Sequence, residues 1–134
     1  MTTVELLMAA DVEKLTARPT MQLEVKSLSE KLGEKFVVTI KALSSRKFTE
    51  LSGLALKSDG TADMSKMADT QALMLVESMV EPNLKDKALQ EHFGVKTPKD
   101  LAFKLFGGGD LAAISAHVTD LSGYGDSSVE EIKN

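Results

Sequence analysis

Residues 80–105 of this chain, VEPNLKDKALQEHFGVKTPKDLAFKL, contain its strongest breaks in helical structure and decide how the chain folds. Pro82 is predicted to end the helix before it, because proline lacks an N–H donor and its ring clashes with a continuing helix. Gly94 stands where glycine is favoured after a helix, and Thr97 and Pro98 have the order of an N-cap and a first helical residue. The stretch therefore predicts a rigid corner of short helices, a feature that suits binding better than catalysis.

The helices on either side of this corner are predicted to supply the core. The preceding helix begins after the cap Asp63 and runs to Val80, and apolar residues cover nearly every side of its second half. That pattern is typical of a central helix. After the corner, a last long helix is expected to begin at Asp110 and to end at Gly123. The three glycines at 107–109 predict a hinge between helices.

The N-terminal half is predicted to contain one helix and then two strands. Apolar residues fall at helical spacing over residues 4–16. Residues 21–25 alternate between apolar and polar, and residues 36–40 are rich in branched and aromatic side chains, which indicates strands. The connection over residues 28–35 is longer than a two-residue turn, so we expect an antiparallel hairpin with a broad loop.

These elements predict an α+β fold that is predominantly helical. A further helix, capped by Ser44 or Ser45, separates the hairpin from the central helix. We expect an N-terminal antiparallel β-hairpin packed with about five to six short helices. The chain length fits a single domain over residues 1–134, with residues 1–18 and 124–134 as flexible ends.

Composition and charge argue against several classes of function. The net charge is -4, from 20 acidic and 16 basic residues, and no window interleaves Lys and Arg with aromatic residues. Nucleic acid binding is therefore not expected. The absence of cysteine excludes disulfides and thiolate metal sites and is ordinary in a reducing cytoplasm. Acidic residues interrupt the apolar ones over residues 1–17, so neither a signal peptide nor a membrane span is predicted.

No group of residues has the spacing of a catalytic, metal or cofactor site. Asp110 follows the glycines at 107–109, where a phosphate-binding loop requires Lys and then Ser or Thr. His92 and His117 each lack a second metal ligand at helical spacing. Ser122 lies outside its neighbouring glycines rather than between them, unlike the nucleophile of a hydrolase elbow. We therefore predict no enzymatic activity, no catalytic residues, no metal and no cofactor.

Several short segments occur in an order that resembles a known family. They are Ala10-Asp11-Val12, Arg18-Pro19-Thr20, residues 36–43, residues 80–87, Phe93-Gly94, Thr97-Pro98 and Leu121-Ser122-Gly123-Tyr124. In order and spacing they resemble the XkdN-like tail assembly chaperones of phages and prophages of Gram-positive bacteria, and the resemblance spans nearly the whole chain. The triple glycine before Asp110 departs from the family pattern, which has an apolar residue or proline and then a glycine-acid pair.

The resemblance implies a non-enzymatic helper that binds the tape measure protein, the long helical ruler of the tail. It would keep that protein soluble in the host bacterial cytoplasm while tube subunits assemble, and it would be absent from the mature virion. Related tail systems also make a longer form by frameshifting, with which the final Lys133-Asn134 is compatible. The alternative function is a structural tail or head-tail connector subunit that is retained in the virion.

The helical corner is the expected contact surface for an apolar face of the tape measure protein. The candidate partner-binding residues are Leu84, Leu89, Phe93, Leu101, Leu105 and Phe106 as anchors, with Met74 and Met79 as adaptable flanks. The competing interpretation places most of these side chains in the core.

Self-association is a second hypothesis about partners. An isolated hairpin is marginal in water, so the apolar face shared by Phe36, Val38 and Ile40 must pack on helices or on the sheet of a partner chain. The exposed edge of the hairpin also favours a homo-oligomer.

Overall fold

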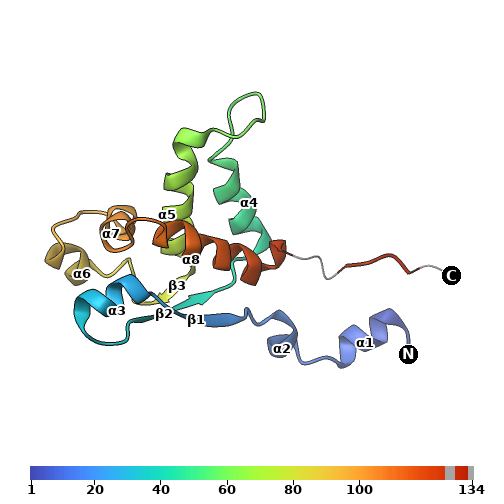
Figure 1. The fold of residues 1–134 in the computed structure, drawn as a ribbon. Helices are drawn as coiled ribbons and strands as arrows, with labels where there is room; N and C mark the ends of the chain where they lie inside the picture. Colours follow the sequence, from blue (N-terminus) through green and yellow to red (C-terminus); the bar gives the residue numbers. More distant parts are fainter. Residues whose placement is uncertain (126–128, 133–134) are drawn as a thin grey trace.

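A short antiparallel sheet with helices stacked over one face forms the body of the protein (Figure 1). The computed structural model describes residues 1–125 and 129–132. The sheet has the order β1-β2-β3, with β1 at Thr20–Glu24, β2 at Val37–Lys41 and β3 at Met79–Glu81. The α-helices are α1 Thr3–Ala9, α2 Val12–Thr16, α3 Lys26–Leu32, α4 Ser45–Gly53, α5 Met67–Ser78, α6 Lys87–His92, α7 Pro98–Leu105 and α8 Asp110–Thr119. A 3-10 helix, η1 at Met64–Lys66, precedes α5, and a π-helix, η2 at Asp120–Tyr124, follows α8. This arrangement confirms the predicted α+β, mainly helical class.

The predicted hairpin is confirmed, and its apolar face packs on helices of the same chain. Thr20 of β1 lies opposite Lys41 of β2 in an antiparallel register. Val38 and Ile40 are fully buried, and they join Leu75 of the central helix α5 in one hydrophobic cluster. No sheet from a partner chain is needed to cover this face.

The broad loop predicted within the hairpin is wrong, because the structure contains helix α3 there. Leu28 and Leu32 stand four residues apart and share one side of a helix, a spacing hidden by the polar residues around them. Gly33 then ends the helix with a φ of 76°. The Phe36 N–H donates to the Ser29 hydroxyl oxygen at 2.8 Å and ties the end of the connection back to α3.

The central helix ends earlier than predicted, because residues Met79–Glu81 form a third strand. Met79 pairs with Ile40 and Glu81 with Thr39. Pro82 disfavours a helical conformation of the residue before it, and the open edge of β2 offers hydrogen-bonding groups to an extended segment.

The single helix predicted over residues 4–16 is wrong, because the chain forms two helices there. Asp11 starts the second helix by accepting a hydrogen bond from the Glu13 N–H at 3.0 Å, in competition with helical continuation. The first helix has the capping box between Thr2 and Glu5. Neither helix has a buried residue, and Figure 1 shows both extending away from the body. At the other end, residues 126–128 and Lys133-Asn134 lie outside the described residues.

Candidate partner-binding site

The structure separates the eight predicted partner-binding residues into two groups. One group is buried, with an exposed fraction of 6% or less, and comprises Met74, Met79, Leu84, Leu101 and Phe106. These side chains belong to the same hydrophobic cluster. In this conformation a partner cannot reach them without opening the core, so here they support the fold.

The second group, Leu89, Phe93 and Leu105, lines an apolar groove at the surface. The groove has a volume of about 400 Å³, and the atoms that its wall exposes are apolar. The remaining lining residues are Leu28, Lys31, Leu32, Phe36 and Pro82, which the sequence did not single out for binding. The four-residue spacing of Leu28 and Leu32 is the signal in the sequence that could have indicated a helical apolar face in this segment, which was predicted to be a loop. We call this feature the apolar groove below.

Helix α3 and the two later helices α6 and α7 position the walls of the apolar groove. Helix α3 presents Leu28 and Leu32 from one side, and α6 presents Leu89 from another. Leu32 is 61% exposed, so part of the groove's wall is fully accessible to another polypeptide. Lys31, an exposed residue, also lines the groove, and only apolar atoms of its side chain contribute to the wall.

Local hydrogen bonds fix α6 against the rest of the corner. The Asp86 carboxylate accepts from the Ala88 N–H at 2.9 Å and from the Leu89 N–H at 3.2 Å, which caps the helix. The buried Gln90 side chain donates to the Leu84 carbonyl oxygen at 2.9 Å. The predicted rigid corner is thus present, and α6 holds Leu89 and Phe93 in place at the groove.

Thr97 and Gly94 build the other side of the corner as the sequence indicated. The Asp100 N–H donates to the Thr97 hydroxyl oxygen at 3.1 Å, which caps α7, and Pro98 is the first helical residue. Gly94 follows Phe93, the C-cap of α6, and adopts a φ of 70°. Helix α7 therefore leaves the corner in a fixed direction and carries Leu105 to the groove.

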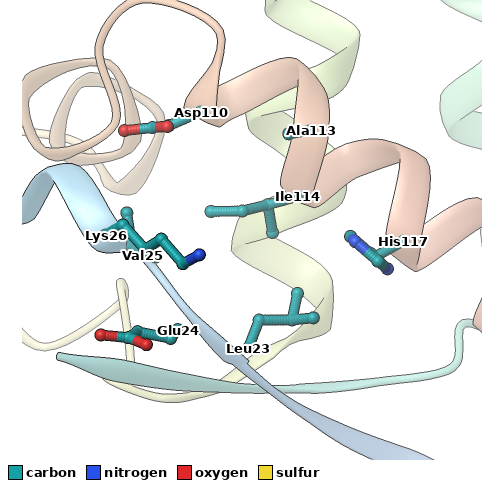
Figure 2. Close-up of a pocket in the computed structure, with 8 residues that line it drawn as sticks. All are labelled: Leu23, Glu24, Val25, Lys26, Asp110, Ala113, Ile114 and His117. Atoms are coloured by element: carbon teal, nitrogen blue, oxygen red, sulfur yellow. The ribbon is translucent and has the colours of Figure 1, made fainter. Parts of the chain in front are cut away.

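A smaller depression lies between α8 and the start of α3 and has a mixed character (Figure 2). Its volume is about 260 Å³. Figure 2 shows Ile114 between Leu23 and the side of α3, with His117 at one end and Asp110 at the other. The Asp110 carboxylate accepts a hydrogen bond from the Ser27 hydroxyl, so it joins α8 to α3.

This depression does not have the donors of a metal site. Glu24 is already engaged, since its carboxylate accepts from the Ser29 hydroxyl at 3.0 Å. Among the residues that the structure describes, no three His, Cys, Asp or Glu side chains are grouped so that they could hold a metal ion. The depression therefore reads as a junction between helices.

The shifted carboxyl groups of the described chain lie far from the groove in sequence, in the segment before α5. The Thr61 hydroxyl donates to Asp59 at 2.7 Å and lowers the pKa of that carboxyl. The Ser65 hydroxyl donates to Asp63 at 2.6 Å and lowers the pKa of Asp63 in the same way. Both groups are local turn and cap residues, so their stabilising effect is present at neutral pH and is lost as acid protonates them.

A second exposed apolar surface lies on α1 and α2. Each of its large apolar side chains is at least 57% exposed, and the set comprises Val4, Leu6, Leu7, Met8, Val12 and Leu15. We call residues 3–16 the N-terminal arm. Sequence periodicity indicated helical structure here but predicted one helix instead of two, and residues 1–18 were expected to be a flexible end of the chain.

No helix within the described part of the chain combines the length and the apolar character needed to cross a membrane.

Known proteins resemble this chain in sequence and in fold. The family model described as Phage XkdN-like tail assembly chaperone protein matches residues 4–134. The crystal structure of the protein YqbN has 21% sequence identity and a TM-score of 0.57, and the match covers 86% of this chain and 98% of that one. It therefore shares the fold. No curated protein matches. The match to the family model extends over almost the whole chain and agrees with the ordered segments of the sequence, so the protein belongs to the XkdN-like family of phage tail assembly chaperones.

Proposed function

We propose that this protein binds the tape measure protein and keeps it soluble during tail assembly, without catalysing a reaction. Membership of the chaperone family supports the assembly role. The proposed location of the binding site depends on one observation, the apolar groove. Residues from α3, α6 and α7 form its open apolar wall.

The shape of the apolar groove suits an amphipathic helix. Its volume of about 400 Å³ can accommodate a few side chains. A client helix would therefore lie across the groove and insert side chains that are spaced three or four residues apart. Leu89, Phe93 and Leu105 would be the anchors, because half-buried apolar residues held by a rigid frame lose little entropy when they are covered.

The net charge of the protein supports the solubilising role. A chain with a charge of -4 keeps that charge exposed after its apolar groove is covered. A client helix coated in this way exchanges an apolar face for an acidic surface, which disfavours aggregation. The protein would act in the host cytoplasm and leave before the virion is complete.

A pair of leucine substitutions tests this placement. Leu32 lines the groove and is 61% exposed, whereas Leu54 follows α4 and is 49% exposed outside the groove. Both can become aspartate with little effect on folding. We expect tape measure protein, co-expressed from the same phage, to stay soluble and to co-purify with the wild type and with Leu54→Asp. With Leu32→Asp, we expect it to move to the pellet.

The outcomes separate the site from the function. Equal capture by Leu32→Asp and Leu54→Asp would show that the groove is not the contact surface. Failure of the wild type to capture the tape measure protein would reject the function itself. Detection of the protein in purified virions in stoichiometric amounts would instead favour the alternative, a structural tail or head-tail connector subunit.

A further inference from the structure

The free edge of strand β1 is the starting point for a surface that the chaperone function does not explain. In the sheet order β1-β2-β3, β1 has β2 on one side and no strand on the other among the described residues. The Val25 N–H donates to the Phe36 carbonyl oxygen, and the Ala42 N–H donates to the Pro19 carbonyl oxygen. Because backbone groups alternate sides along a strand, the N–H and C=O groups of Thr20, Gln22 and Glu24 point away from β2.

The N-terminal arm continues directly from this edge. Ala17, Arg18 and Pro19 separate α2 from β1, and the residue before a proline is held in an extended conformation. The arm therefore continues outward from the start of β1, and α3 begins at the opposite end of the strand (Figure 1).

Antiparallel pairing of two β1 strands would bring the arm of one chain to the groove of another. In such a pair, Thr20 of one copy lies beside the partner's Glu24, so each arm runs on toward the partner's α3, which forms one wall of the apolar groove. The arm, with its two helices and extended joints, spans roughly 30 Å, which exceeds the ~10 Å length of α3. We propose that two copies pair through their β1 edges about a two-fold axis at Gln22, each covering the other's apolar groove with its arm.

One face of the arm has the apolar spacing that the groove requires. On α1, Val4, Leu7 and Met8 share a side at positions i, i+3 and i+4, whereas Leu6 lies on the opposite side. On α2, Val12 and Leu15 stand three residues apart, on one face of that helix. The arm thus presents to the groove the kind of apolar helical face that a client would present.

Charges and size agree with a second copy as the occupant. The arm carries Glu5, Asp11 and Glu13 against Lys14, while Lys31 lines the groove. In the two-fold register Glu24 meets the partner's Thr20, so no carboxylates face each other across the strands. The strand edge, arm and groove together supply a number of residues comparable to the roughly 20–30 per side of a stable interface.

This inference rests on the proposed function in one respect, namely that the groove is the client site. The paired state would be the resting form, in which each arm occupies the groove until a client helix displaces it. Covering the groove and the arm together would remove both of the exposed apolar surfaces described above from water.

Light scattering on the full chain tests the paired state. We expect the wild type to have twice the mass of one chain at high concentration. Leu7→Asp should halve that mass, because it places a charge on the docking face of the arm. Leu6→Asp is the matched control, with the same change on the opposite face one residue away, and it should keep the doubled mass. Circular dichroism should be unchanged in both, since neither side chain is buried.

Engineered cysteines test whether the arm docks in another copy, because the chain has no cysteine of its own. One preparation carries Leu7→Cys and a second, differently tagged, carries Leu32→Cys. On mixing under mild oxidation we expect a mixed disulfide to form much faster than when Leu6→Cys replaces Leu7→Cys. A fast disulfide only within one chain that carries both cysteines would overturn the inference, because the arm would then dock on its own groove.

The remaining outcomes distinguish this inference from the proposed function. A wild type with the mass of a single chain at all concentrations, or a doubled mass that persists in Leu7→Asp, would overturn the pairing. We expect Leu7→Asp to capture tape measure protein at least as well as the wild type, since its grooves are free. Loss of capture in Leu7→Asp would identify the arm as the client surface and would overturn the inference. Loss of capture in Leu32→Asp alone would support the groove as the client site and would leave the pairing to be judged by the mass measurements.

Discussion

Gly94 shows how a single residue sets the direction of the chain at the groove. Its φ of 70° is left-handed, and a β-carbon there would meet no atom within 4 Å, so the constraint is conformational rather than steric. Gly107 offers the matched case, because it also has open space but does not have a left-handed φ. The two glycines separate the cost of backbone conformation from that of crowding.

Replacing these glycines by alanine should therefore have different effects on stability. We expect Gly94→Ala to lower the free energy of unfolding by about 1 kcal/mol, because L-residues are strained in the left-handed region. Gly107→Ala should stay within about 0.5 kcal/mol of the wild type. Urea unfolding followed by circular dichroism measures both, and equal effects would contradict the conformational explanation.

At the scale of single residues, the sequence predicted the N-caps of helices well, but it did not predict which apolar side chains are buried and which are exposed. The residues Ser44, Asp63 and Thr97 cap helices as expected, because a cap depends on residues two or three positions away. Whether Leu89 lies at a groove or in the core depends on α3, about sixty positions earlier in the chain. That relation has no local signal.

At the scale of elements, long periodic segments were predictable and short ones were not. The hairpin and the central helix have enough residues for their periods to stand out. Helix α3 and strand β3 are short, and their conformations depend on tertiary contacts with β2 and the corner. The split between α1 and α2 depends on one side-chain cap at Asp11.

The β1 edge gives a prediction at the same scale. We expect Gln22→Pro to weaken self-association on the order of tenfold or more, because it removes an outward N–H from each strand and places a ring in the path of the partner. The melting temperature of the separated chain should hardly change, since no hydrogen bond to β2 is lost. Sedimentation at several concentrations measures the effect, and an unaltered association constant would argue against strand pairing.

At the scale of the whole molecule, the family was recognisable from the order of short segments, and the model match over residues 4–134 confirms it. The fold class followed from the same elements. The relation between the arm and the groove was not accessible, because each is an ordinary apolar pattern in sequence. Only the three-dimensional arrangement shows that one lies outside the body and the other opens at its surface.

Thermal unfolding should report the paired state of the whole molecule. Association of folded chains makes stability depend on concentration, so we expect the melting temperature of the wild type to rise by about 2–3 °C for each tenfold increase in protein. Leu7→Asp should show no such dependence. Differential scanning calorimetry over a hundredfold range of protein concentration measures this dependence. A wild-type melting temperature that does not change with concentration would contradict the paired state.

The arm and the groove belong to one polypeptide, and this fixes their ratio at one to one whatever the level of synthesis. In the proposed paired state, each groove that a tape measure helix took over would set one arm free, and that arm would be available to the groove of a further copy. Occupancy at one point along a long client would in this way promote occupancy at the next, so coating would spread in rows rather than at random.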